Sequence, residues 1–153
     1  MLIQEFSNPL NASPLVFPAL ECFHITGFAI LVGTIAIQDF RLLGIGMTHQ
    51  KAEDLYKDLS PWTLIGLAIM LVSGPMMFSS DPDMYYLNWS FLIKMVFLLA
   101  AIVFNYTVHK KTLQAGAAPG THQGIAFISL FLWAAVVFGG IFIGFVGEGL
   151  SLS

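Results

Sequence analysis

The sequence predicts an all-helical bundle of four transmembrane helices in up-down-up-down order. The chain of 153 residues is 57% hydrophobic but only 10% charged, whereas about a quarter of the residues in a soluble domain are charged. Four apolar runs approach the ~20 residues that a helix needs to cross a bilayer. Short connections after the second and third runs favour antiparallel neighbours. We therefore expect a single integral membrane domain, residues 1–153, with the lipid bilayer around it.

The first predicted helix covers residues 15–38. Residues 11–14, Asn-Ala-Ser-Pro, favour a turn or cap before it. No Lys or Arg precedes this run, and it is longer than the apolar part of a signal peptide, so we expect it to remain in the protein. Residues 39–60 hold most of the charge and are expected to form a polar connection, with a short amphipathic helix at 51–59 as an option.

The other three helices follow from their boundary residues. Pro61 is expected to open the second helix, 61–78, because proline suits a first helical turn. The sequence SSDPD at 79–83 is typical of a turn and precedes the third helix, 89–109. A loop of small residues, 115–120, leads to the fourth helix, 124–146.

The basic residues predict the orientation of the bundle. Five of the six follow the first and third helices: Arg41, Lys51, Lys57, Lys110 and Lys111. Because basic residues are enriched on the cytoplasmic side, we expect both termini to be periplasmic, in a bacterial inner membrane. The formal net charge of -3 excludes a basic surface for nucleic acid.

Two predicted helices carry polar residues through apolar sequence. An ionisable side chain inside hydrocarbon costs ~2.5 to 3.5 kcal/mol, so each needs a partner or a role. We expect two stripes with helical spacing to face each other inside the bundle. They consist of Glu21, His24, Gly27, Leu31, Thr34, Gln38 and Arg41, and of Lys94, Leu98, Ala101, Asn105 and His109.

The histidines are candidate ligands of two separate sites. His24 and His109 lie toward opposite ends of the bundle, roughly 20 Å apart at 1.5 Å per helical residue, so they cannot bind one metal ion. His49 or His122 is available as a second ligand beside His109. The plausible companions of His24 by depth are Glu21, Met76, Met77, Met84 and Lys94.

A b-type haem fits this distribution of residues. Its iron takes His, with Met as an alternative partner, and its porphyrin needs an apolar gap between helices. Arg41 and Lys94 can pair with the haem propionates. Copper is the alternative, because Met is a soft ligand that suits Cu(I).

Purely structural roles are also open for each of these residues. His24 can be a packing residue whose hydrogen-bond partner is Glu21, and His49 and His122 can be plain surface residues. Lys94 can extend to the membrane interface. Asp39 and Arg41 can pair only to cap the first helix.

Two segments resemble a bacterial family of small four-helix membrane proteins of unassigned function: ECFHITGFAILVGTIAIQDFRLLGIG and YYLNWSFLIKMVFLLAAIVFNYTVHKK. His24 and residues 39–44 match its first motif, and Lys94 and His109 open and close its third helix. The architecture is also similar to the copper-resistance D membrane domain and, more distantly, to four-helix b-type cytochromes. These resemblances imply copper handling or electron transfer. The two matched His pairs of transmembrane di-haem cytochromes are not found in this sequence.

We therefore expect a b-type cytochrome-like subunit that binds one or two haems and transfers electrons. Its first-choice ligands are His24 and His109, with His49 or His122 as the second ligand near His109. A copper-handling protein and a structural subunit of a larger membrane complex are the alternatives. Glycine-rich faces favour a homo-oligomer or packing against partner membrane subunits. An electron-transfer protein is favoured over a stand-alone enzyme, and the sequence does not identify the redox partner.

Overall fold

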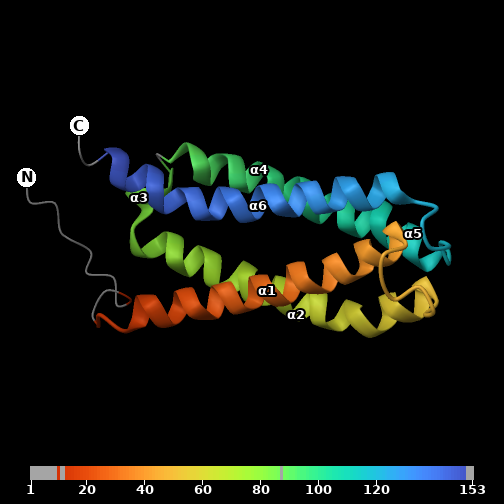
Figure 1. Ribbon diagram of the computed structural model, residues 1–153. Coiled ribbons are helices and arrows are strands. Elements are labelled where there is room, and N and C mark those ends of the chain that lie inside the picture. The colour runs from red at the N-terminus through yellow and green to blue at the C-terminus, as the bar shows by residue number, and fades with distance from the viewer. Residues whose placement is uncertain (1–9, 11–12, 87, 151–153) are drawn as a thin grey trace, which may run out of the picture.

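Four long helical segments run the length of the protein (Figure 1). The computed structural model describes residues 10, 13–86 and 88–150, without the side chains of residues 84 and 146–150. The described elements are α1 (Val16–Leu43), α2 (Ala52–Ser80), α3 (Pro82–Tyr86), α4 (Trp89–Phe104), the π-helix η2 (Asn105–His109), α5 (Lys110–Gln114) and α6 (Gln123–Leu150). This part of the chain contains no strand, which confirms the predicted all-helical class.

Four spans are long and apolar enough to cross a membrane. They are Val16–Leu43, Ala52–Ser80, Trp89–Gln114, which joins α4, η2 and α5, and Gln123–Phe145. Most of their side chains face outward, as expected where lipid replaces a protein core. The chain is therefore a multi-pass membrane protein in a lipid bilayer.

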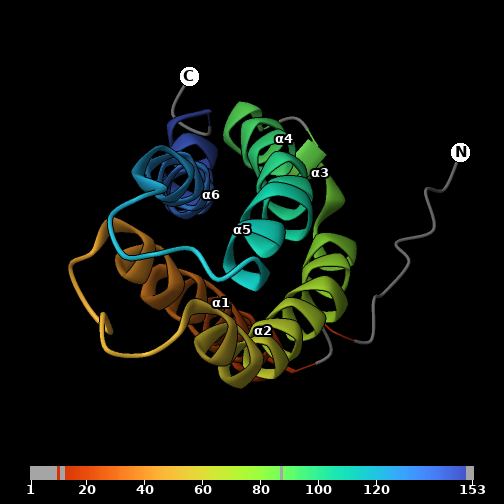
Figure 2. The same ribbon diagram turned by 90° about the vertical axis from the view of Figure 1, so that its right-hand side faces the viewer.

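The spans are arranged as two pairs, α1 with α2 and α4 with α6 (Figures 1 and 2). We call the end where α1 begins and α6 finishes the terminal end, and the opposite end, with the connections α1–α2 and α5–α6, the loop end. The pairs lie close together at the loop end and diverge toward the terminal end (Figure 1).

The expected polar connection at 39–60 is shorter in the structure, and the helix considered for 51–59 is the first part of α2 rather than a separate element. The helix α1 continues to Leu43, because its charged residues near the end have partners inside the protein. The helix α2 begins at Ala52, with Glu53 and Asp54 in a first turn where the helix dipole favours acidic groups. Pro61 therefore lies inside α2 rather than at its start. Only residues 44–51 connect the two helices.

The close contact between α1 and α2 depends on a glycine of α2, Gly66. A Cβ atom on Gly66 would lie 2.7 Å from both the carbonyl oxygen of Gly27 and the backbone nitrogen of Leu31. Real Cβ atoms do not approach backbone atoms so closely, so only glycine at Gly66 permits this helix crossing.

Two apolar clusters fill the interior at different levels of the bundle. The larger one consists of Leu31, Ile35, Leu67, Met70, Leu98, Ala101, Trp133 and Val136. The smaller one, at the loop end, consists of Leu42, Ala52, Leu113, Ala117 and Ala126. On α1, Gln38 and Asp39 fall between the two clusters, and on the third span Asn105 and His109 do so. The interior therefore contains a layer of polar residues between two apolar ones.

The loop end is tied together by backbone contacts. Gly44 ends α1 with a left-handed φ of 78°, and its N–H donates to carbonyls of the last turn. The Gly120 N–H donates to the Leu42 carbonyl at 2.9 Å, and a Cβ on Gly44 would lie 3.3 Å from the Gly120 nitrogen. The connection between α5 and α6 is thereby fixed to the end of α1.

Candidate functional site

The first group of polar residues, which we call the terminal-end site, consists of His24, Ser73 and Lys94. His24 Nδ1 lies 2.7 Å from Ser73 Oγ on α2. The Ser73 hydroxyl donates its single hydrogen to the Ile69 carbonyl at 2.6 Å. Its oxygen must therefore accept the Nδ1–H of His24, which leaves the lone pair of a neutral imidazole on Nε2. The site thus presents a histidine in the tautomer that binds metals through Nε2.

Lys94 approaches this histidine from the other helix pair. Its side chain is half-buried and lies along the glycines of α6, where a Cβ on Gly140 would be 3.4 Å from its Nζ. Lys94 is close enough to His24 to act on it electrostatically. Glu21, the partner expected for His24, is instead exposed. The hydrogen-bond partner of His24 is Ser73, so the expected pairing with Glu21 is wrong.

Aromatic side chains pack at the same end of the bundle. Tyr85 in α3 is buried against Phe78 and Phe91, with ring centroids 6.0 and 5.6 Å away. Burial, and then the negative charges of Glu21 and Asp81, raise the pKa of the Tyr85 phenol above its usual value near 10. Tyr85 therefore stays protonated at neutral pH.

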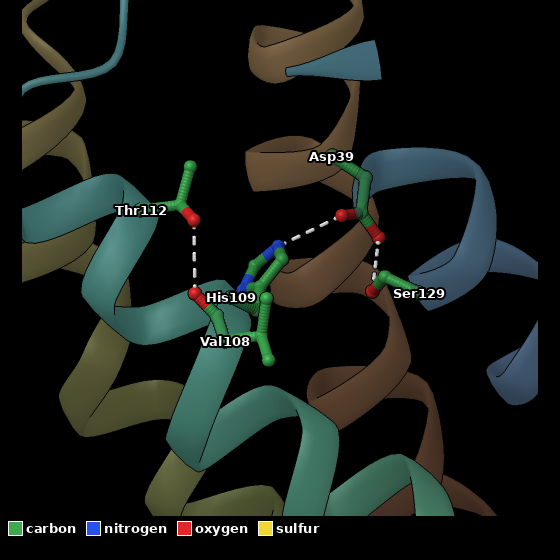
Figure 3. A network of polar contacts seen from close by, with 5 residues as sticks. All are labelled: Asp39, Val108, His109, Thr112 and Ser129. Atoms are coloured by element: carbon green, nitrogen blue, oxygen red, sulfur yellow. Dashed lines mark hydrogen bonds and ion pairs between the residues drawn. The ribbon is translucent and has the colours of Figure 1, made fainter. Parts of the chain in front are cut away.

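A second group of residues, which we call the polar layer, lies between the two apolar clusters. Its first half is a network of Asp39 on α1, His109 on η2 and Ser129 on α6 (Figure 3). Asp39 Oδ1 lies 2.8 Å from His109 Nε2, and Asp39 Oδ2 accepts a hydrogen bond from Ser129 Oγ at 2.7 Å. The Asp39 and His109 side chains have no exposed surface. This network joins three of the four spans inside the membrane.

The π-helix η2 brings two residues of the third span into this layer. Ala101, Asn105 and His109 of the predicted stripe are spaced four residues apart. An α-helix has 3.6 residues per turn, so in a regular α-helix these residues would drift away from one face. The N–H of Lys110 bonds to the carbonyl of Asn105, five residues earlier, so the turn is widened by one residue. Asn105 and His109 are both buried as a result, 7% and 0% exposed.

The second half of the polar layer lies on the α2 side of α1. Gln38, Thr63, Asn105 and Tyr106 lie around a small cavity there, and the hydroxyls of Thr34 and Thr63 are 2.9 Å apart. Apart from Glu21, which is exposed, the residues of both stripes are buried or half-buried, which confirms that these faces point into the bundle.

The remaining predicted site residues lie at the loop end. His49 is exposed in the α1–α2 connection, and His122 is exposed with its Nδ1 2.8 Å from Thr121 Oγ1. Within the described part of the chain, neither forms a hydrogen bond with His109. Arg41 is buried, and its Nε donates to the Gln50 carbonyl at 2.9 Å. The expected pairing of Arg41 with Asp39 is wrong, because Asp39 binds His109 and Ser129.

The described residues gather no cluster of three or more His, Cys, Asp or Glu side chains able to hold a metal ion. The suggested methionines are also spread out: Met76 is exposed, Met77 is half-buried, and the Met84 side chain lies outside the described part. Asp39, the partner of His109, follows His24 by fifteen residues, or roughly 22 Å along a helix. As expected, the two intramembrane imidazoles are therefore in separate sites.

Ser73 and Ser129 were missed as partners of the histidines. Each carries a hydroxyl within a predicted apolar helix, at the depth of an imidazole on another helix. Depth matching is the signal that could have found them, because a buried imidazole requires a polar partner.

Comparison with known proteins identifies a family. The sequence model of the Family of unknown function (DUF6644) matches residues 16–146, from the start of α1 almost to the end of α6. No curated protein and no solved structure matches the chain.

Proposed function

The chain belongs to DUF6644, a family of unknown function, and we propose that it is a b-type cytochrome-like membrane subunit that binds haem at His24 and transfers electrons. The observation that carries this proposal is the hydrogen bond between His24 and Ser73. It orients the imidazole through Nδ1–H and leaves Nε2 with its lone pair, which is the arrangement typical of metal-binding histidines. A haem iron bound there would supply reversible one-electron reduction.

The surroundings of His24 fit a haem in three respects. The imidazole is half-buried among apolar spans, as an axial ligand needs to be. Gly74 has no side chain on the part of α2 that lies beside the imidazole: a Cβ on Gly74 would lie 3.6 Å from His24 Cε1. Lys94 supplies the cation that a propionate requires.

The polar layer is a less favourable place for a haem. His109 already directs Nε2 to Asp39, so it could bind iron only through Nδ1, which is buried and has no hydrogen-bond partner among the described residues. A second haem at His109, with His49 or His122 as its other ligand and Arg41 near a propionate, therefore takes second place in the proposal.

The alternative occupant of His24 is copper. The free Nε2 would also suit Cu(I), with Met76, Met77 or Met84 as soft ligands. This alternative rests on the resemblance of the four-helix architecture to the copper-resistance D membrane domain. A structural subunit without any cofactor is the third possibility that the test must separate.

We further propose that the terminal end faces the periplasm of a bacterial inner membrane. The support is the distribution of basic residues, because Arg41, Lys51, Lys57, Lys110 and Lys111 all lie toward the loop end. Assembly into a homo-oligomer, or with partner membrane subunits, is favoured by open small-residue surface, such as Gly144.

Visible spectroscopy and metal analysis of purified protein test the proposal. The full chain should be produced in cells supplied with haem precursor and purified in mild detergent. We expect a Soret band that shifts on addition of dithionite and returns on reoxidation. In His24→Ala the band should be lost, whereas His122→Ala, a matched control at an exposed histidine, should retain it.

Added imidazole separates a ligand role from a folding role. If His24→Ala folds, free imidazole should restore part of the Soret band by occupying the space of the lost side chain. Haem retained in full by His24→Ala would contradict the proposal. A colourless protein with one copper per chain would favour copper, and a folded protein with neither would leave the structural role.

A further inference from the structure

The polar layer borders a small, partly open cavity between α1, α2 and η2. Its walls are uncharged polar side chains from all three elements, namely Gln38, Tyr56, Ser60, Thr63, Asn105 and Tyr106. The space open to a water molecule is about 10 Å³, close to the least volume that holds one water. The cavity is thus of the right size for a single small polar molecule.

Several polar groups around this cavity lack partners. The Tyr106 hydroxyl is buried and has no hydrogen-bond partner among the described residues. Gln38 and Asn105 are only 2% and 7% exposed, and no hydrogen bond joins either side chain to another described residue. The Thr63 hydroxyl, in contrast, already donates to the Leu59 carbonyl at 3.0 Å.

Such an arrangement is costly unless something fills it. A buried polar group without a hydrogen bond costs about 1 to 3 kcal/mol, and in a bilayer no solvent is at hand to relieve that cost. Buried waters typically make about three hydrogen bonds to groups of this kind. The cavity offers three: one phenol hydroxyl and two carboxamides.

We propose that this cavity binds one water molecule, held by Tyr106, Gln38 and Asn105. The six lining side chains carry no formal charge, so a neutral molecule fits better than an ion. The bound water would complete the polar layer on the α2 side, as Asp39 does on the α6 side. This inference does not depend on haem binding.

Solid-state NMR of the full chain in lipid bilayers tests the proposal. Magnetisation should pass from water to the side-chain amide of Asn105, and not to the methyl groups of Leu31 in the apolar cluster. Tyr106→Phe removes one hydroxyl and keeps the ring, so it should reduce the transfer at Asn105 several-fold. Tyr86→Phe, at an exposed tyrosine of α3, is the matched control and should leave the transfer unchanged.

Three results would overturn the proposal. Absence of transfer to Asn105 in the unmodified protein would mean that the cavity is dry, and this result does not depend on whether a variant folds. Asn105 signals that move when sodium is exchanged for potassium, without transfer from water, would mean that the occupant is a cation. Transfer that is unchanged in folded Tyr106→Phe would equally place the water elsewhere.

Discussion

The terminal-end site and the polar layer each contain a histidine within the membrane spans, but the partners of the two rings differ. His24 meets a neutral hydroxyl that accepts from Nδ1, so Nε2 is left for a ligand. His109 meets a carboxylate through Nε2, and that carboxylate is also bonded to Ser129. The chemistry of a buried histidine therefore depends on its partner: the hydroxyl at His24 leaves Nε2 able to bind a ligand, whereas the carboxylate at His109 occupies Nε2.

The largest expected effect comes from breaking the network of the polar layer. Asp39→Ala leaves His109 and Ser129 buried without their partner, so we expect a loss of ~3 to 5 kcal/mol in the free energy of unfolding. His24→Ala should cost much less stability, because its partner is a neutral hydroxyl. Denaturant unfolding in detergent, followed by circular dichroism, measures both variants.

The double variant Asp39→Leu/His109→Leu is the control for that experiment. It removes both partners. Its loss of stability should be clearly smaller than the sum of the losses in Asp39→Leu and His109→Leu, because no unpaired charge remains. Strict additivity would mean that the pair is not coupled, and the contrast between the two sites would then fail.

The serines give a second and smaller contrast. Ser129→Ala removes a hydrogen bond to a carboxylate and should cost ~1.5 to 3 kcal/mol, whereas Ser73→Ala removes one between neutral groups and should cost ~0.5 to 1.5 kcal/mol. Only Ser73→Ala should change the reduction potential of a haem bound at His24. Equal potentials in Ser73→Ala and the unmodified protein would argue against a role of Ser73 in orienting the ligand.

A substitution at the crossing of α1 and α2 should affect the two sites differently. Gly66→Ala forces a Cβ against the backbone of α1, so we expect a loss of ~1 to 3 kcal/mol. The hydrogen bond between His24 and Ser73 links α1 to α2 and should weaken, while the Asp39–His109 contact links α1 to the third span and should persist. Histidine ¹⁵N chemical shifts report on both rings.

Gly33→Ala is the matched control for the crossing, since a Cβ at Gly33 has no neighbour within 4 Å. It should be neutral or should stabilise the helix by up to about 1 kcal/mol. A comparable loss in both glycine variants would show that close approach is not what Gly66 provides.

The smallest effect concerns pH at the terminal end. The pKa of Tyr85 is raised in the folded protein, so the folded chain holds this proton at pH values where the unfolded chain has lost it. Stability contributed by the neutral phenol is therefore complete below pH about 10 and is lost as the pH rises further. Tyr85→Phe should remove part of that alkaline loss, measured as the unfolding midpoint between pH about 8 and 11. An unchanged alkaline profile in the variant would contradict the assignment.

The fold could be predicted well from the sequence, because length and hydrophobicity alone decide which segments cross a bilayer. The ends of α1 and α2 were not predicted correctly. Asp39 and Arg41 resemble residues of a polar loop. Their buried helical positions are stabilised by partners that helical spacing does not reveal: His109 and Ser129 on other helices for Asp39, and the Gln50 carbonyl for Arg41. Pro61 is typical of a helix start, but in the structure it lies inside α2, which begins at Ala52.

The candidate site could be predicted only in part. Helical spacing identified the faces that carry His24 and His109, and the structure confirms that His109 lies inside. The hydrogen-bond partners considered for His24 and Asp39 were wrong. A hydrogen bond between helices depends on the rotation and depth of both helices, whereas residue spacing describes only one helix. Ser73, Ser129 and the π-helix have no signature within their own segments.

The π-helix also limits how the third span can be redesigned. The extra residue in Asn105–His109 puts α4 and α5 out of phase by about 100° relative to one continuous α-helix. Deleting a single residue there would rotate α5 and withdraw Leu113 from the apolar cluster at the loop end, even though the hydropathy of the segment would barely change. For sequence alignment and engineering, this span is two helices that share one axis.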